Sequence, residues 1–212
     1  MLSVHSFTFN PFQENTYIIA NEHNDCWIID PGMSNENEEN ELVNFIQSKN
    51  LKPQAIINTH AHIDHILGVD FLVKKYNIPF YLHEKEYPIL MNAGNTARMF
   101  GFQFDGVNAA PESISENKTL KLGADELDVR FVPGHSPGSV AFYFKAGSWV
   151  ISGDALFAGS IGRTDLPMGN YETLISSIKN NLLNLPGETR VYSGHGPSTS
   201  IEIETNSNPF LQ

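Results

Sequence analysis

The chain has 212 residues, of which 41% are hydrophobic, and its 24 acidic and 13 basic side chains give a formal net charge of −11 at pH 7. This length and composition allow a substantial buried core and predict a single domain over residues 1–212. The acidic charge argues against nucleic acid as a partner, because phosphate backbones are bound through basic surfaces.

Strands followed by amphipathic segments are expected in the first half of the chain. Short apolar or β-branched runs predict strands at residues 2–9, 16–20, 26–30, 54–58 and 79–83. Turn-rich segments join the first three strands and predict an antiparallel meander. Helices are expected at 38–49, 66–76 and 84–91, with a loop at 92–96. Within the 92–110 stretch, the apolar residues 99–102 could line a substrate mouth or cover the core.

The second half repeats this order of strands and helices. Strands are expected at residues 119–122, 127–132, 140–144 and 149–152, with a further short strand before His195. An apolar stripe predicts a helix over 171–185, with Asn170 as its cap and Pro186 as its stop, and at most a short helix is expected in 201–212. An order of strands and outer helices that occurs twice predicts an α/β fold built as a four-layer αββα sandwich.

The single cysteine and the N-terminal residues indicate the cellular compartment in which the protein is expected. Cys26 is the only cysteine, so no internal disulfide can form, and its position in an apolar run predicts a core side chain rather than a nucleophile. The first residues lack the basic start and apolar stretch of a signal peptide, and no apolar run approaches the about 20 residues of a membrane span. We therefore expect a soluble, unprocessed cytoplasmic protein with no membrane partner.

Residues 59–65 read Thr-His-Ala-His-Ile-Asp-His and contain four side chains that can bind metal. They follow an expected buried strand, where a loop is held rigidly at its base. His60 and His62 lie two apart in an extended loop, so both imidazoles can project the same way and bind one metal. Asp64 and His65 point elsewhere, start the next helix and could hold a second metal.

Three downstream residues supply the further ligands that two metals require. His135 stands where an apolar strand enters a Gly/Pro-rich turn, and Asp154 and His195 each follow a glycine at a strand end. Glycine there allows the sharp turns and close approach that a crowded ligand set needs. Structural zinc sites usually contain several cysteines, so a His/Asp set is expected to be catalytic.

The remaining histidines stand in no such cluster and are expected to be ordinary hydrogen-bonded side chains. They are His5, His23 and His83.

Five motifs in this order resemble the metallo-β-lactamase superfamily and, within it, the glyoxalase II (hydroxyacylglutathione hydrolase) branch. They lie at residues 59–65, 133–138, 152–154, 159–165 and 193–196 and cover nearly the whole chain. The sequence is most similar to the short bacterial-type form without the C-terminal helical domain. The resemblance implies the αββα fold named above and a site with two divalent metal ions.

The resemblance also implies a role for each candidate site residue. Asp64 and Asp154 are expected to be catalytic. His60, His62 and His135 would hold the first metal, Asp64, His65 and His195 the second, and Asp154 would bridge both. Asp30 and Asp165 are expected behind the ligands, where they support the loops. Zinc is the expected metal, and the same ligands also accept iron or manganese.

Arg163, in the 159–165 loop, has two open interpretations. Its planar guanidinium could bind a substrate carboxylate, or it could form a salt bridge with Asp165 that braces the loop.

The expected function is hydrolysis of a 2-hydroxyacyl thioester, a small molecule such as S-lactoylglutathione. Two divalent ions that share Asp154 would supply a bridging hydroxide near neutral pH to attack the carbonyl. A thiolate leaving group needs little general acid, which suits a site without an obvious proton donor. The first alternative is an iron-dependent persulfide (sulfur) dioxygenase, and the second is a lactonase or β-lactamase-type hydrolase. A non-catalytic metal-binding or ligand-binding protein is the least favoured, and the oligomeric state is left open.

Overall fold

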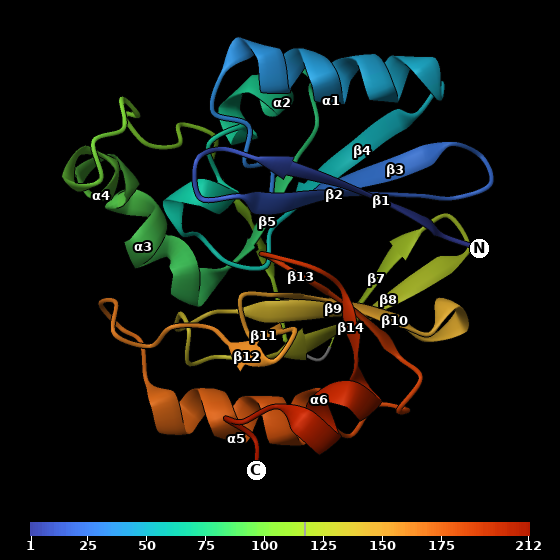
Figure 1. Cartoon of the computed structure of the whole chain (residues 1–212). Coiled ribbons are helices and arrows are strands. Elements are labelled where there is room, and N and C mark those ends of the chain that lie inside the picture. Colours follow the sequence, from blue (N-terminus) through green and yellow to red (C-terminus); the bar gives the residue numbers. More distant parts are fainter. Residues whose placement is uncertain (117) are drawn as a thin grey trace. The chain divides into compact units, whose positions relative to one another are not determined.

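A computed structural model describes residues 1–116 and 118–212 of the chain. The chain divides into two compact units (Figure 1). Unit 1 comprises Met1–Ile114 and Leu122–Asp125, and unit 2 comprises Ser115–Lys121 and Glu126–Gln212. The expectation of a single domain stays a prediction, and each unit is described by itself.

Unit 1 contains a six-stranded sheet in the order β1-β2-β3-β4-β5-β6. Its strands are β1 (Ser3–Phe9), β2 (Glu14–Ala20), β3 (Asp25–Ile29), β4 (Lys52–Ile57), β5 (Phe80–His83) and β6 (Glu112–Ile114). β1, β2 and β3 pair antiparallel, which confirms the expected meander. β3, β4, β5 and β6 pair in parallel, so their carboxyl ends meet at one edge of the sheet.

Two helices of unit 1, α1 (Glu36–Ser48) and α2 (Val69–Tyr76), cover one face of this sheet (Figure 1). They bury an apolar stripe against the strands. The core includes Leu42, Ile46 and Leu72 from the helices and Ile18, Ile28 and Ile56 from the strands. α1 begins two residues before its expected start because the Asn35 side chain accepts hydrogen bonds from the backbone of Asn37 and Glu38.

The structure corrects two expectations in unit 1. The helix expected from residue 66 begins only at Val69, and Asp64 and His65 lie in a separate 3₁₀ turn, Ile63–His65. The loop expected at 92–96 belongs to a helix, α4 (Ala93–Met99), which follows α3 (Tyr87–Met91). Gly94, a poor helix former, is required there because a Cβ would lie 2.6 Å from the carbonyl oxygen of Asp105.

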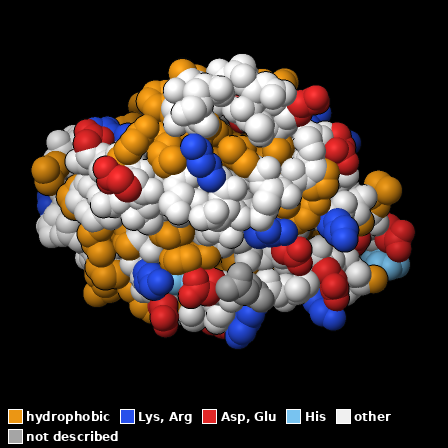
Figure 2. Space-filling model, turned by 90° about the horizontal axis from the view of Figure 1, so that it is seen from below, with side chains coloured by type: hydrophobic (Ala, Val, Ile, Leu, Met, Phe, Trp, Pro, Cys, Tyr) orange, Lys and Arg blue, Asp and Glu red, His pale blue; other side chains and the backbone are white. Residues whose placement is uncertain are grey.

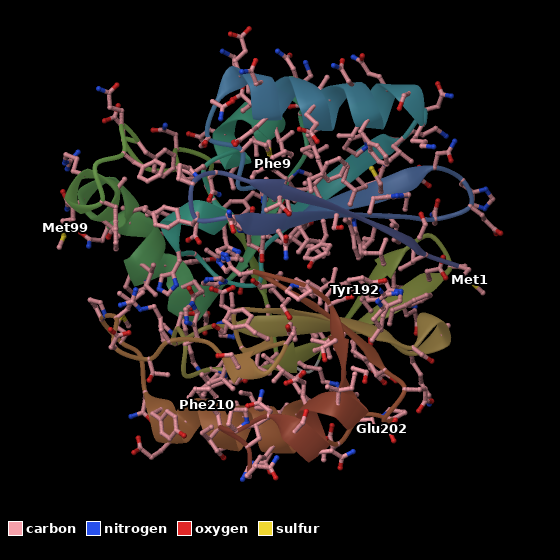
Figure 3. The ribbon with its side chains drawn as sticks, in the orientation of Figure 1. Met1, Phe9, Met99, Tyr192, Glu202 and Phe210 are labelled. Atoms are coloured by element: carbon pink, nitrogen blue, oxygen red, sulfur yellow. The ribbon has the colours of Figure 1, made fainter. Side chains whose placement is uncertain are left out.

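The structure bears on one of the two interpretations offered for the 99–102 segment, its role as a cover for apolar residues. Met99 is 86% exposed and projects from the end of α4 (Figure 3), whereas Phe9, also labelled there, is buried in the core. Phe102 stacks on Phe12 with ring centroids 5.2 Å apart. Part of the segment therefore covers apolar surface and part is exposed to solvent.

Unit 2 contains a second six-stranded sheet, in the order β14-β13-β10-β9-β8-β7, and a two-stranded sheet of β11 and β12. The strands are β7 (Thr119–Leu122), β8 (Asp125–Phe131), β9 (Val140–Phe144), β10 (Trp149–Gly153), β11 (Leu156–Phe157), β12 (Ser160–Ile161), β13 (Arg190–Ser193) and β14 (Thr199–Ser200). β10 and β13 are parallel neighbours, so the residues that follow them lie at one edge.

Helices α5 (Tyr171–Asn181) and α6 (Ile201–Ser207) complete unit 2 and lie on one side of its sheet (Figure 1). Leu174 and Ile178 of α5 and Ile201 of α6 pack in a core with Val150 and Val191. α5 ends four residues before the expected end, and α6 is the short helix expected near the C-terminus. Among the described residues, no helix combines the length and apolar character needed to cross a membrane.

Candidate metal centre

The loop after β4 carries the four candidate ligands of unit 1, and Asn58 ties its two ends together. The Asn58 side-chain amide donates to the carbonyl oxygens of His65, at 2.8 Å, and of His60, at 3.3 Å. Asn58 is fully buried, so these bonds are shielded from water. The loop is therefore closed on itself by a side chain that the sequence analysis did not single out.

The structure brings the four side chains together in the two expected pairs. The candidate ligand atoms of His60 and His62 lie within 4.8 Å of one another, as do those of Asp64 and His65. The rings of His60 and His62 are 4.9 Å apart at 89°, so they approach a shared point from different directions. Nε2 of His65 lies 3.7 Å from Oδ2 of Asp64. Their roles as metal ligands stay predictions.

Asp30 stands directly after β3 and orients this loop from behind. Its carboxylate accepts hydrogen bonds from Thr59 N at 2.7 Å, Thr59 Oγ1 at 2.5 Å and His65 Nδ1 at 3.1 Å. Because a carboxylate cannot donate, the proton of His65 lies on Nδ1, and Nε2 is left to bind a metal. Asp30, His60 and His65 also form a ligand-like group, but the Asp30 oxygens already serve the loop.

Glu14 is a second buried carboxyl near His65 that the sequence analysis did not identify. It is completely buried, and its Oε1 lies 3.8 Å from Nδ1 of His65 while its Oε2 accepts from Thr16 Oγ1 at 2.9 Å. Burial raises the pKa of the Glu14 carboxyl well above its ordinary value, and the charge of Asp30 raises that pKa further, although His65 lowers it. In the sequence Glu14 adjoins a turn-rich segment, and nothing there distinguishes it from an exposed acid.

In unit 2, a backbone carbonyl orients His135 after the end of β8. Nδ1 of His135 donates to the carbonyl oxygen of Arg163 at 2.8 Å, so Nε2 is the unprotonated nitrogen that could coordinate a metal. His135 is 2% exposed, and its Nε2 lies 3.5 Å from Oδ2 of Asp154. The imidazole therefore has one fixed tautomer and one inward-facing nitrogen.

Asp154 and His195 follow the parallel strands β10 and β13, whose ends are joined by a bond from Gly194 N to Gly153 O of 2.9 Å. Nε2 of His195 lies 3.5 Å from Oδ2 of Asp154, the same distance as Nε2 of His135. One carboxylate oxygen is thus equidistant from two imidazole nitrogens that come from different strand ends. This is the placement that a carboxylate shared by two metals would need.

The segment that carries Arg163 packs closely against these ligands. Gly162 leaves no room for a side chain, because a Cβ would overlap the carbonyl oxygen of Asp154 and lie 3.0 Å from Nδ1 of His135. The Arg163 guanidinium pairs with both oxygens of Asp165 at 2.7 Å, and this pairing lowers the pKa of Asp165 to about 2. The salt bridge expected as one of two interpretations is therefore present, on an exposed part of the loop.

The donor set suits divalent transition metals. It consists of imidazole nitrogens and carboxylate oxygens with orienting partners behind them, and zinc, iron and manganese all accept such ligands. His5, His23 and His83 belong to no candidate metal group among the described residues, and the Nδ1 atom of His83 accepts from Lys85 N, as expected for ordinary histidines. Burial raises the pKa of the Cys26 thiol to about 12, which supports its role as a core side chain.

The sequence signature of the Metallo-beta-lactamase superfamily matches residues 9–195, and the chain belongs to this superfamily. The chain is 44% identical to a probable metallo-hydrolase of Bacillus subtilis, YqgX, over 95% of this chain and 93% of the relative. It is 34% identical to the hydroxyacylglutathione hydrolase GloC of Haemophilus influenzae, over 94% and 93% of the two chains. The chain is accordingly a metal-dependent hydrolase of this superfamily.

Solved structures confirm the expected fold class. The BLEG-1 B3 metallo-β-lactamase matches with a TM-score of 0.91 and 38% identity, over 99% of this chain and 100% of that one. The protein TTHA1623, solved in a di-iron-bound form, matches with a TM-score of 0.87 and 40% identity, over 98% and 100%. The protein therefore has the α/β metallo-β-lactamase fold.

Proposed function

We propose that the protein hydrolyses a 2-hydroxyacyl thioester such as S-lactoylglutathione. The observation that carries the proposal is the position of Asp154, whose Oδ2 lies 3.5 Å from Nε2 of both His135 and His195. A shared carboxylate of this kind suits two metals that act on one water molecule. The similarity to the GloC hydrolase of Haemophilus influenzae supports the thioester as substrate.

Seven residues would hold two divalent metal ions in this proposal. The first ion is assigned to His60, His62 and His135, the second to Asp64, His65 and His195, and Asp154 to both. Zinc is the proposed metal. The di-iron form of TTHA1623 supports iron as the alternative.

Groups of the chain would orient the metal ligands before the substrate binds. When bound, the metals would lower the pKa of a water molecule so that hydroxide is available near neutral pH. Asp30 and the carbonyl of Arg163 hold the protons of His65 and His135 on Nδ1, so each imidazole presents Nε2. A thiolate leaves as a weak base, so the chain needs no strong general acid for this substrate.

A small-molecule substrate also agrees with the charge of the protein. The face shown in Figure 2 carries Lys and Arg side chains singly, interspersed with Asp, Glu and apolar side chains. Nucleic acid would require a continuous basic surface. We therefore propose a small thioester as the partner and no role in nucleic-acid binding. We also propose that the chain binds no membrane and acts as one domain in the cytoplasm.

Arg163 is the proposed contact for a substrate carboxylate, although it is paired with Asp165 in the structure. Arg163→Ala keeps the main-chain carbonyl that orients His135, so chemistry and folding should persist. If the side chain binds substrate, the KM for S-lactoylglutathione should rise about 10-fold or more at unchanged kcat. An unchanged KM, with only a small loss of stability, would assign Arg163 to loop bracing alone.

β-Lactam hydrolysis is the second candidate function. The 38% identity to the BLEG-1 B3 metallo-β-lactamase, over nearly the full length of both chains, favours it. The same metal-activated water would attack the amide carbonyl of the lactam ring. The two functions share the metal site and differ in the substrate pocket.

The deciding experiment measures turnover of S-D-lactoylglutathione and of a chromogenic cephalosporin by the purified metal-loaded protein, with an oxygen electrode in the same vessel. Glutathione persulfide is then added to test the dioxygenase alternative. Thioester hydrolysis without oxygen consumption is the expected result. Oxygen uptake with an inert thioester would transfer the protein to the dioxygenase class, and hydrolysis of the cephalosporin alone would favour the second candidate.

Asp64→Ala tests the dinuclear part of the proposal. Loss of this carboxylate should lower the metal content from two ions towards one, and it should lower thioester turnover at least about 100-fold, since a metal contributes several kcal/mol of transition-state stabilisation. Retention of both ions and of turnover would exclude a two-metal mechanism that uses Asp64.

A further inference from the structure

Glu86 lies beside the metal-ligand loop, although it is 21 or more residues distant in sequence, because two parallel strands end together. β4 leads into residues 58–65, and β5 leads into a short 3₁₀ turn, Glu84–Glu86. The two strands are hydrogen-bonded neighbours, and Asn58 N donates to the carbonyl oxygen of Tyr81 at 3.0 Å. The segment after β5 therefore runs along the loop that carries the histidines.

The side chain of Glu86 reaches the middle of this loop. Its Oε2 accepts a hydrogen bond from the backbone nitrogen of Ala61 at 2.9 Å. Glu86 and Ala61 are both completely buried, whereas Glu84, two residues earlier in the same turn, is exposed. Ala61 is the residue between His60 and His62.

A fully buried carboxyl needs a physical reason. Removing it from water is costly unless hydrogen bonds compensate, and a carboxylate bonded to a backbone N–H is among the stronger hydrogen bonds. An apolar residue at position 86 would fill the same space without the desolvation cost. The hydrogen bond from Ala61 N is a compensating contact of this kind, and it joins the buried carboxyl to the peptide between His60 and His62.

Three side chains hold successive peptide groups of the loop that carries the histidines. Asp30 holds the backbone and hydroxyl of Thr59, and Asn58 holds the carbonyls of His60 and His65. Glu86 holds the peptide between the two histidines whose rings lie 4.9 Å apart at 89°. A rotation of that peptide would swing the two imidazoles relative to each other.

We propose that Glu86 is a positioning residue that fixes the Ala61 peptide and so sets His60 and His62 for the first metal. The inference rests on the proposed metal assignment and adds to it a residue outside the ligand motif. Glu86 itself is not a ligand in this proposal, and it acts on the metal through the backbone.

The test compares Glu86→Ala and Glu86→Gln with the full-length wild-type protein, using zinc alone as the probe. Zinc affinity is measured by competition with a chromophoric chelator, and hydrogen exchange of the Ala61 amide is measured by NMR in the chelated protein. Glu86→Ala should weaken binding of one zinc ion about 10- to 100-fold, the usual effect of removing an orienting partner. It should also speed exchange at Ala61, because the amide loses its acceptor.

Glu86→Gln is the conservative variant, because its amide oxygen can still accept from Ala61 N. It should restore most of the zinc affinity and of the amide protection lost in Glu86→Ala. A purely space-filling role would leave zinc affinity the same in both variants at matched stability.

Asp70→Asn provides a matched control in the same unit. Asp70 also accepts from backbone nitrogens, those of Asn108 at 2.9 Å and Ala109 at 2.9 Å, but it lies outside the ligand loop. This variant should lose stability without losing zinc affinity.

Wild-type zinc affinity in Glu86→Ala, with unchanged exchange at Ala61, would overturn the inference. A loss of zinc affinity in Glu86→Ala that is no larger than the loss in Asp70→Asn would also overturn the inference. If Glu86→Ala does not fold, Glu86→Met, which fills similar space but has no carboxylate acceptor for Ala61 N, replaces it and is compared with Asp70→Asn by the same two readouts. Failure of the proposed function can be distinguished from failure of this inference. The first would appear as absent thioester turnover in the wild-type protein, whereas hydrogen exchange of the Ala61 amide is measured without metal.

Discussion

A backbone carbonyl orients His135, and its segment packs so closely against the candidate ligands that single residues there have little freedom to change. The carbonyl of Arg163 fixes the tautomer of His135, and Gly162 lies against the carbonyl oxygen of Asp154 and Nδ1 of His135. A side chain at position 162 would have to displace the backbone of Asp154 or the ring of His135. The site therefore depends on small residues as much as on the ligands themselves.

Gly162→Ala should destabilise the protein by about 1–3 kcal/mol, the usual cost of overpacking a filled site. It should also weaken metal binding, because the added methyl group displaces Asp154 or His135. Urea unfolding and metal analysis measure the two effects. Gly187→Ala is the control, because a Cβ at position 187 would approach nothing closer than Cβ of Glu202 at 3.3 Å. A loss there as large as at position 162 would contradict the prediction.

Cys26 should make the stability of the protein fall at alkaline pH. Its thiol pKa is raised from 9.0 to about 12 by burial, so above pH 9 the unfolded chain loses a proton that the folded chain keeps. Stability is then complete below the unfolded pKa and declines as the pH rises towards 12. At pH 10.5 the loss is about 2 kcal/mol relative to pH 8, from 1.5 pKa units at about 1.36 kcal/mol each.

The measurement compares urea unfolding of the wild type and Cys26→Ala at pH 8 and pH 10.5. The variant should be less stable at both pH values, but its stability should change less between them, because it lacks the thiol whose ionisation burial opposes. An identical pH dependence in the two proteins would contradict the burial of the thiol.

At the scale of elements, the strand ends explain which parts of the site were predictable. His60, His135, Asp154 and His195 follow short strands. Parallel pairing brings the ends of β4 and β5 to one edge in unit 1 and the ends of β10 and β13 to one edge in unit 2, whereas β8, before His135, pairs antiparallel with β9. The pattern of strand, glycine and ligand is local, so it is visible in the sequence. Glu86 has no such signal, because its acceptor role depends on the pairing of β4 with β5.

The helices show the same division between local and tertiary causes. The start of α5 was predictable because Asn170 caps it through a local bond to Thr173 N. α4 was not, because Gly94 and Asn95 are poor helix formers and the helix is retained by close contact with the backbone of Asp105. The two boundaries next to the metal loop also shifted, since a 3₁₀ turn replaces the expected start of a helix.

Asn170→Ala should lower stability by about 1 kcal/mol, the typical cost of an N-cap. Its side-chain oxygen accepts from Thr173 N at 2.8 Å, whereas its backbone nitrogen donates to Gly134 O, and the substitution leaves that second bond intact. Urea unfolding should show the loss, and Asn170→Asp should recover it. Asn180→Ala on the exposed side of the same helix is the control and should be neutral or slightly stabilising, because alanine is the better helix former.

At the scale of the whole molecule, the two units differ from proteins that fold only around a metal. Each has an extended apolar core with a helix layer packed on a sheet, unit 1 around Ile18, Leu42 and Leu72 and unit 2 around Val150, Leu174 and Ile178. These cores contain none of the candidate ligands. Folding should therefore precede metal binding, and metal should add stability to an already folded chain.

Removal of metal with a chelator should abolish thioester hydrolysis while the far-ultraviolet circular dichroism at 25 °C stays unchanged. Readdition of zinc to a free concentration of about 100 times its Kd should stabilise the protein by about 2.7 kcal/mol, because zinc binds the folded chain only. For a chain of this size that corresponds to a rise in Tm of roughly 5–10 °C. Asp64→Ala, which retains one proposed site, should show a smaller rise. Loss of the dichroism signal on chelation would mean that the metal, and not the two apolar cores, holds the fold together.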